Sequence, residues 1–273
     1  MRPKTTSKSG WVLSFLSWIT LVFCGLLPAA ASGAEQRTGE IQVAAAADLQ
    51  FALDAIAHEF QRLNPEIRVQ ISYGSSGNFY SQILNQAPFD IYFSADLSYP
   101  RKLAEEGLAI AGSDFVYAVG RLALWVPKSS ALDVKHLGMA ALRLDTVQHI
   151  AIANPKHAPY GKAAEAAIRS MGFYDAVQSK LVFGENVAQA FQFVQSGASE
   201  IGIIALSLAL APGVRDQGEY WEVPVGKYPR LEQGGIIVKW AKNPGGAREL
   251  RAFVLGAQGR AILKNFGYLL PGD

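Results

Sequence analysis

The hydrophobic positions of this chain follow two alternating periodicities from residue 41 onward. The run IQVAAAA at 41–47 is apolar at every position except Gln42, which is typical of a buried strand. The next apolar residues recur at steps of four and three, as on one face of an amphipathic helix: Leu49, Leu53, Ile56, Phe60 and Leu63. Further strands are expected at RVQISY and DIYFSA, and further helices at 79–86 and YPRKLAEEG. Such alternation indicates βαβ units with mainly parallel strands.

The second half of the chain repeats this plan after a long apolar segment. FVYAVGRLALWVP at 115–127 is too long for one ordinary strand and has Gly120 in its middle, which predicts a strand that crosses between two lobes. Three more strands are expected at HIAIANP, KLVFGEN and EIGIIAL, each followed by a helix. The apolar run at 234–240 is then expected to lead back to the first lobe, before two terminal helices.

We therefore predict a two-lobed α/β fold, in which each lobe is a mainly parallel sheet flanked by helices and the ligand cleft lies between the lobes. Lobe I is expected to comprise 35–118 and 229–273, and lobe II 119–228. Open α/β sheets bind ligands at the carboxyl ends of their strands. The turns that join strands to helices are therefore the places where a site is expected.

The first 34 residues have the pattern of a secretory signal peptide. Arg2, Lys4 and Lys8 precede an apolar run at 11–27, and the small residues AAASGA end at Ala34. The apolar run is short for a membrane span of about 20 residues. We therefore predict an exported, periplasmic protein that begins near residue 35.

Removal of this segment changes the chemical inventory. The whole chain has 25 basic and 23 acidic residues, and loss of Arg2, Lys4 and Lys8 leaves 22 against 23, a net charge of −1. A nucleic-acid partner requires a basic surface, so none is expected. Cys24 is the single cysteine, so the processed chain has no disulfide, thiol nucleophile or cysteine metal site.

Four strand-to-helix turns are rich in small residues and poor in charge: AAADLQ around Asp48, YGSSGN around Ser76, NPKHAPYGKA around Tyr160 and GENVAQ around Val187. Each presents unpaired backbone N–H groups at the positive end of a helix dipole. Such helix starts bind anions without lysine or arginine. The two serines of the second turn would add hydroxyl donors, although serines at this place can also simply cap a helix.

The segments VAAAADLQFAL, YGSSGNFYSQI, APFDIYFSAD, IANPKHAPYG and QGRAILKNFGY together resemble the periplasmic molybdate-binding proteins of ABC importers. The resemblance covers essentially the whole chain after residue 34. It implies the type II periplasmic-binding-protein fold, a tetrahedral molybdate or tungstate dianion held by neutral donors, and delivery of that anion to a membrane permease. It implies no cofactor, no bare metal cation, no enzymatic activity and a monomeric protein.

The resemblance also implies which residues hold the anion: Ala47, Asp48, Ser75, Ser76, Tyr160 and Val187. Ala47, Asp48 and Val187 are expected to act through backbone N–H groups, and Ser76 and Tyr160 through their hydroxyls. The sequence departs from the family in two places. Ala205 stands where some members have a tyrosine, and Asp48 stands where many have serine.

Asp48 is a difficult residue for an anion site, because an ionised carboxylate would repel a dianion. Unit charges 4 Å apart interact by about 4 kcal/mol at an effective dielectric of 20. We expect the side chain to cap the helix that begins at Leu49. The alternative is that the carboxylate accepts a hydrogen bond from a protonated ligand such as hydrogen phosphate or a phosphonate. Phosphate, phosphonate and sulfate therefore remain alternative ligands.

A serine hydrolase is the hypothesis from a different functional class. A triad could combine a serine with His157 and Asp48 or Asp96, but YGSSGN does not fit the G-x-S-x-G nucleophile motif and the four histidines are scattered. No H-x-x-x-H pattern suggests a metal site. The aromatic residues around the turns are expected in the core and cleft wall rather than in a sugar platform.

Overall fold

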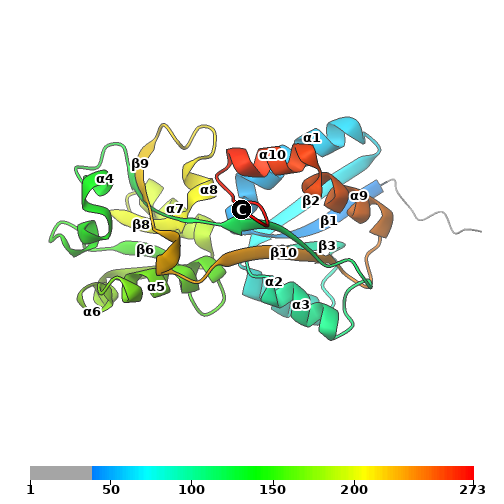
Figure 1. Ribbon diagram of the computed structural model, residues 1–273, viewed down its shortest axis with the longest axis horizontal. Helices are drawn as coiled ribbons and strands as arrows, with labels where there is room; N and C mark the ends of the chain where they lie inside the picture. The colour runs from blue at the N-terminus through cyan, green and yellow to red at the C-terminus, as the bar shows by residue number, and fades with distance from the viewer. Residues whose placement is uncertain (1–38) are drawn as a thin grey trace, which may run out of the picture. The chain divides into compact units, whose positions relative to one another are not determined.

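The computed structural model describes residues 39–273, and the predicted signal peptide at 1–34 lies outside the described residues. The described part contains two five-stranded sheets with helices packed on them (Figure 1). This arrangement confirms the predicted two-lobed α/β architecture. The lobe boundaries at 118/119 and 228/229 stay a prediction.

The first sheet has the strand order β2-β1-β3-β10-β4. Its strands are β1 (Gly39–Ala46), β2 (Ile67–Gly74), β3 (Ile91–Ser94), β4 (Phe115–Gly120) and β10 (Leu231–Ile237). β1 is parallel to β2 and β3, and β10 is antiparallel to β3 and β4. Only β10 therefore runs against the others, and the sheet is mainly parallel as predicted.

Helices cover both faces of this sheet. In Figure 1, α1, α9 and α10 lie on one face, and α2 and α3 lie on the other. Their bounds are α1 Gln50–Leu63, α2 Ser76–Leu84, α3 Ser98–Glu105, α9 Pro244–Leu255 and α10 Ala257–Asn265. The 3₁₀ turn η1 (Ala47–Leu49) joins β1 to α1. The stripe of apolar residues predicted for α1 is buried except at its last member, Leu63.

The second sheet has the order β7-β6-β8-β5-β9. Its strands are β5 (Leu122–Pro127), β6 (Ile150–Ala153), β7 (Leu181–Gly184), β8 (Ile201–Ala205) and β9 (Gly218–Glu222). Its helices are α4 Val134–Leu137, α5 Pro159–Ser170, α6 Tyr174–Val177, α7 Val187–Gln195 and α8 Leu206–Ala209, and its 3₁₀ turns are η2 Gly138–Arg143, η3 Gln178–Lys180 and η4 Val225–Lys227. β9 was not predicted, because this half-buried edge strand contains two glutamates and lacks a continuous apolar run.

The chain crosses between the sheets at Arg121, as the long apolar segment predicted. β4 ends at Gly120 in the first sheet and β5 begins at Leu122 in the second (Figure 1). The guanidinium of Arg121 donates to the carbonyl of Gly267 at 2.7 Å and pairs with Glu222 at 2.7 Å. These bonds tie the crossing point to the end of the chain and to β9.

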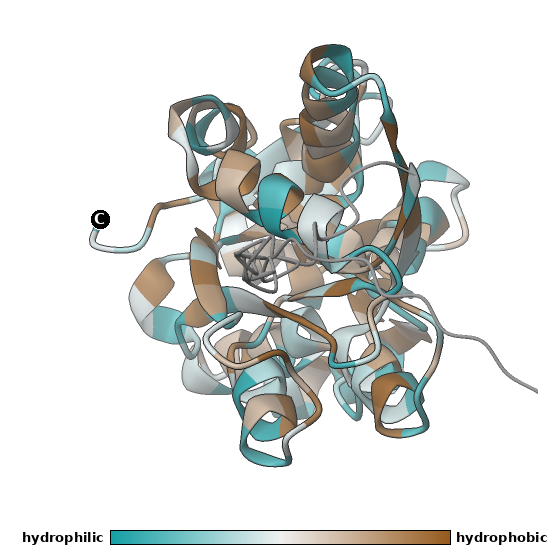
Figure 2. Cartoon of the chain, turned by 90° about the vertical axis from the view of Figure 1, so that its right-hand side faces the viewer, coloured by the Kyte–Doolittle hydropathy of each residue, from teal (hydrophilic) through white to brown (hydrophobic). Residues whose placement is uncertain are grey.

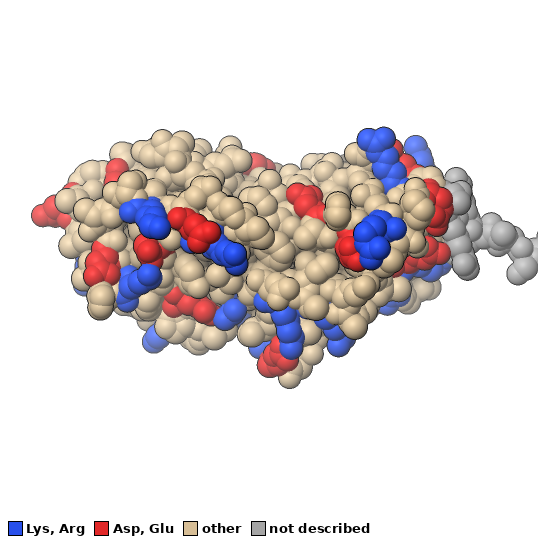
Figure 3. Space-filling view, turned by 90° about the horizontal axis from the view of Figure 1, so that it is seen from above, with Lys and Arg blue, Asp and Glu red and all other residues tan. Residues whose placement is uncertain are grey.

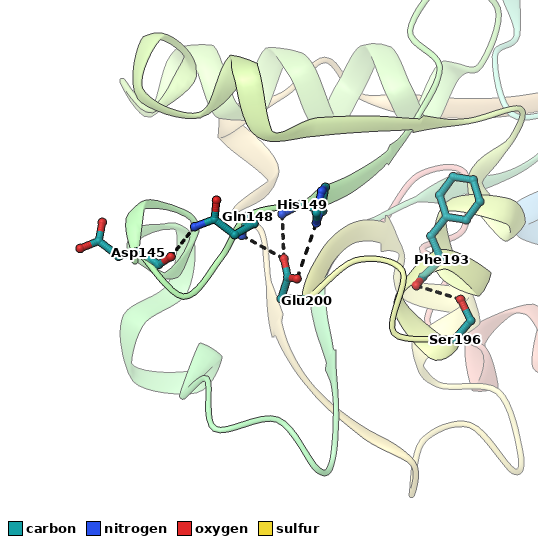
Figure 4. A network of polar contacts seen from close by, with 6 residues as sticks. All are labelled: Asp145, Gln148, His149, Phe193, Ser196 and Glu200. Atoms are coloured by element: carbon teal, nitrogen blue, oxygen red, sulfur yellow. Dashed lines mark hydrogen bonds and ion pairs between the residues drawn. The ribbon is translucent and has the colours of Figure 1, made fainter.

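The residues divide between core and surface as the hydropathy pattern requires. Individual helices carry both hydrophobic and hydrophilic turns in Figure 2, as expected for helices that bury one side. On the face in Figure 3, basic and acidic side chains are interspersed. Polar contacts fix the loops, as where Glu200 accepts from the backbone N–H groups of Gln148 and His149 before β6 (Figure 4).

Candidate functional site

A small cavity lies where the four turns of the two lobes meet. It is lined by Ala46, Ala47, Asp48, Gly74, Ser75, Ser76, Ala95, Ala158, Pro159, Tyr160, Asn186 and Val187. All six residues predicted to hold the anion are in this set. The volume of the cavity is about 10 Å³, close to that of one water-sized sphere. An enclosure of this size suits a compact solute, not a sugar or a peptide.

The first turn differs from the prediction, because the Asp48 side chain does not cap a helix. Neither η1 nor α1 has a side-chain cap bond at its start. The carboxylate oxygen Oδ2 instead accepts hydrogen bonds from Gln233 Nε2 at 2.7 Å and from the Tyr268 hydroxyl at 2.8 Å. Hydrogen bonds from residues that are distant in sequence thus hold the Asp48 side chain in the buried interior.

Asp48 also contacts the second lobe. The Tyr160 hydroxyl, which accepts from Gln233 Nε2, lies near its carboxylate, and the Ser207 hydroxyl donates to its backbone carbonyl at 2.7 Å. The second carboxylate oxygen, Oδ1, is buried and has no hydrogen-bond partner among the described residues. A buried polar atom without a partner is costly, so this oxygen is a candidate contact for a bound ligand.

Burial raises the pKa of the Asp48 carboxyl to about 6, because desolvation of the charge outweighs the hydrogen bonds from Gln233, Tyr268 and Tyr160. No lysine or arginine lines the cavity. An ionised Asp48 would therefore be the one formal charge of the lining, and it has the wrong sign for an anion.

The second turn places two buried serines at the start of α2. Ser76 Oγ accepts from the backbone N–H of Ala95 at 3.0 Å, which leaves its own hydroxyl proton free to donate into the cavity. Ser75 precedes the helix, but its side chain makes no cap bond. Its hydroxyl instead contacts Nδ1 of His157 at 3.0 Å. The capping alternative for these serines is therefore wrong.

The third turn brings Tyr160 from the second lobe to the first. Tyr160 is buried at the start of α5, and its hydroxyl accepts from Gln233 Nε2 at 3.1 Å. Desolvation, together with the nearby Asp48, raises its pKa well above the usual value, so the hydroxyl keeps its proton. That proton can go to Asp48 or to a ligand, but not to both at once.

The fourth turn is organised by Asn186. Its side-chain oxygen accepts from the backbone N–H groups of Ala188 and Gln189 and so caps α7. Val187 is the first residue of this helix and lines the cavity. The amide at this position has no acceptor within the helix, which suits the predicted backbone donor.

Direct bonds between the lobes close the rim of the cavity. The backbone N–H of Gly77 donates to the carbonyl of His157 at 2.9 Å. A Cβ on Gly77 would lie 2.6 Å from that oxygen, so only glycine allows this approach. Close by, the Asn78 side-chain amide hydrogen-bonds Glu185. The structure therefore describes a closed arrangement of the four turns.

Sequence reasoning missed the residues that support the site from behind. Gln233, Tyr117, Ser207 and Tyr268 surround Asp48 without lining the cavity. A glutamine directly before the apolar part of β10 was a usable signal for Gln233. Tyr268 belongs to a segment that carried the family resemblance, but nothing local indicated that its hydroxyl reaches Asp48.

The geometry of a triad, as the hydrolase hypothesis framed it, is absent from the described residues. His157 meets Ser75 through Nδ1 and lies 3.9 Å from Glu185 through Nε2. The Asp48 carboxylate is instead bonded to Gln233 and Tyr268, and that of Asp96 to the backbone N–H of Ser98. Within residues 39–273, no group of three metal-ligating side chains could hold a metal ion. No helix in this part of the chain has the length and apolar character needed to cross a bilayer.

Known proteins resemble this chain over most of its length. A family model for bacterial extracellular solute-binding proteins matches residues 41–269. The molybdate-binding protein ModA of Azotobacter vinelandii is 39% identical over 244 residues, which are 89% of this chain and 93% of that protein. ModA of Rhodobacter capsulatus is 35% identical over 251 residues, 92% of this chain and 94% of that protein. The solved structure of the Azotobacter vinelandii periplasmic molybdate-binding protein has a TM-score of 0.79 at 34% identity, covering 85% of this chain and 99% of that one.

Proposed function

This chain belongs to the bacterial extracellular solute-binding proteins, and from that premise we propose that it binds molybdate or tungstate in the periplasm and delivers the anion to the permease of an ABC transporter. The names of its relatives support the ligand. No cofactor is needed for this role, because the oxyanion itself is the cargo. Absence of catalytic activity, a monomeric state and absence of a nucleic-acid partner stay predictions.

The observation that carries the proposal is the meeting of four helix starts from two lobes around one cavity. Ala47, Ser76, Tyr160 and Val187 each lie in the first residues of a helix or 3₁₀ turn and line that cavity. Amide and hydroxyl donors placed in this way stabilise an anion without a countercharge. A fully deprotonated tetrahedral dianion fits such a donor set, because each of its oxygens can only accept.

Binding would be coupled to movement of the lobes. Bonds between the lobes hold the rim of the cavity closed, so we expect the anion to enter when the lobes separate, with the crossing strands around Arg121 and β10 as the hinge. Closure then buries the anion among the donors of both lobes. The closed form, with its direct Gly77–His157 bond, is the one that a permease would distinguish from the open form.

Calorimetric titration of the processed protein with molybdate, tungstate, sulfate and phosphate at pH 7 tests the proposal. We expect tight binding of molybdate and tungstate and no measurable heat from the other two. Binding of phosphate or sulfate, with no measurable binding of molybdate, would contradict the ligand assignment.

One observation favours phosphate or a phosphonate as the second candidate. The Asp48 carboxylate lines the cavity and has an unpartnered oxygen, which could accept a hydrogen bond from a protonated oxyanion. The same titration decides between the two, since hydrogen phosphate carries such a proton and molybdate does not.

A further inference from the structure

The Asp48 carboxyl is the feature of the cavity that a site for a dianion explains least. It is 1% exposed, it lines the cavity, and its Oδ1 has no partner among the described residues. Two donors, from Gln233 and Tyr268, already bind Oδ2 of the carboxylate, and the Tyr160 hydroxyl lies nearby, bonded to Gln233. These donors hold the carboxylate in place, so it cannot swing away when an anion arrives.

We propose that Asp48 takes up one proton from solvent when the anion binds, and that the protonated Oδ1 then donates a hydrogen bond to an oxygen of the anion. This inference rests on the proposed function, because it assumes an oxyanion in this cavity. The only bonds that change are the O–H bond formed at Oδ1 and the hydrogen bonds around it. Asp48 would then be a donor of the site and a determinant of its pH dependence.

Two physical effects favour the protonated form in the complex. First, a neutral carboxyl removes the like charge that would oppose the dianion in an enclosed cavity. Second, a neutral Asp48 is a weaker acceptor, so the Tyr160 hydroxyl can turn its proton from Asp48 toward the anion. Protonation of one residue thus adds two donors to the cavity, Asp48 Oδ1 and the Tyr160 hydroxyl.

In the free protein, the Asp48 carboxyl ionises less readily than an exposed aspartate does. Its burial already raises the pKa of Asp48 to about 6. A dianion beside it raises that pKa further, because the charged form of Asp48 then also faces repulsion. At pH 7 to 8 the free protein therefore holds mostly ionised Asp48, and the complex holds the protonated form.

The groups that face Asp48 do not titrate in the same range. They are Tyr160 from α5, Tyr268 from the chain end and Tyr117 from β4, and burial raises the pKa of each hydroxyl well above its ordinary value. Gln233 and Ser207 carry no charge. His157 and Glu185 at the rim are the remaining titratable groups near the cavity, since His157 Nδ1 contacts Ser75 and His157 Nε2 lies 3.9 Å from Glu185. This pair therefore needs its own control.

Isothermal titration with molybdate in buffers of different ionisation enthalpy measures the protons taken up per anion. For the wild type at pH 7.5 we expect uptake of about one proton, and an affinity that falls toward tenfold per pH unit above the pKa of free Asp48. Asp48→Asn keeps the size of the side chain without the titration. It should bind molybdate with no proton uptake and no pH dependence between pH 6.5 and 8.5.

Two further variants keep the test decisive. Asp48→Ser serves the same purpose if the asparagine variant does not fold. His157→Gln should retain the proton uptake of the wild type.

Tight binding by the wild type without proton uptake would overturn this inference and leave the proposed function intact. Uptake that persists in both Asp48 variants, or that disappears in His157→Gln, would also overturn it. Failure to bind any oxyanion would overturn the proposed function and this inference together.

Discussion

The side-chain amide of Gln233 donates a 2.7 Å hydrogen bond to the Asp48 carboxylate, although the two residues are 185 positions apart in the chain. The other end of the amide, Oε1, accepts from the Tyr117 hydroxyl at 2.8 Å. These two bonds fix the orientation of the amide, so that its N–H groups face Asp48. The buried Asp48 carboxylate thus accepts a hydrogen bond from Gln233, which is itself fully buried.

This arrangement predicts an unusual pH dependence of stability. The pKa of Asp48 is raised in the folded protein from 3.8 to about 6, so the folded state binds the proton more tightly than the unfolded state. The stabilising contribution of this proton to the free energy of unfolding is fully present below pH 3.8 and is lost as the pH rises through about 6. The loss is about 3 kcal/mol, because each pKa unit corresponds to about 1.4 kcal/mol.

Asp48→Asn removes this dependence. We expect the stability of the variant, relative to the wild type, to improve by about 3 kcal/mol between pH 3 and pH 7 without anion. Urea unfolding at several pH values measures the difference, and other carboxyl groups cancel because both proteins contain them. Parallel curves for the two proteins would show that Asp48 titrates normally.

Ser76→Ala should weaken anion binding. The substitution removes a hydroxyl that is held by the amide of Ala95 and can donate into the cavity. A hydrogen bond to a charged group contributes about 1.5 to 3 kcal/mol, which sets the expected loss of binding free energy.

Ser81→Ala is the matched control, because Ser81 lies on the same helix, is exposed, and bonds only the carbonyl of Gly77 through its hydroxyl. Titration calorimetry with molybdate compares the two variants. Equal affinities would remove Ser76 from the site.

Tyr160→Phe should lower affinity through two effects. It deletes a donor to the anion, and it deletes the 3.1 Å hydrogen bond by which α5 of the second lobe contacts Gln233 in the first. We expect a loss of about 1 to 3 kcal/mol in binding free energy. Tyr174→Phe on α6, outside the cavity lining, is the control with the same chemical change. If both variants bind as the wild type does, the hydroxyl of Tyr160 has no role in binding.

Gly77→Ala should impair closure of the cavity. The added Cβ would lie 2.6 Å from the carbonyl oxygen of His157, which is backbone of the opposite lobe and cannot move aside cheaply. We expect at least a tenfold loss of affinity and a more open molecule in the presence of molybdate. Small-angle scattering with and without the anion measures the opening.

Gly226→Ala is the control for this change, since its Cβ would meet no atom within 4 Å. A Gly77→Ala variant that closes normally on the anion would mean that the rim contact is not needed for closure.

Local patterns predicted most of the elements, because they depend on residues close together in the chain. The apolar steps of α1, the largely apolar run of β1 and the glycine at the end of β4 each had a local cause. The edge strand β9 escaped prediction, since its two glutamates and partial burial break the apolar pattern. Its pairing with β5 comes from tertiary structure.

The six site residues were predicted as a set, and the cavity brings all six together. Their roles as ligands of the anion stay a proposal. The prediction for the Asp48 side chain was wrong, because local reasoning offered only the nearest free amides as partners. Partners from β10 and the chain end compete with those amides, and the sequence does not indicate such distant neighbours.

The sequence by itself determined the order of the elements, the two-lobed plan and the four turns with free amides, because hydrophobic periodicity and helix starts are local properties. Only the tertiary structure decided which side chains share one buried environment. It placed Gln233 and Tyr268 against Asp48, His157 against Ser75, and Tyr160 between the lobes. The pKa of Asp48 and the closure of the cavity depend on burial and on these long-range contacts, which the fold creates when it brings distant segments together.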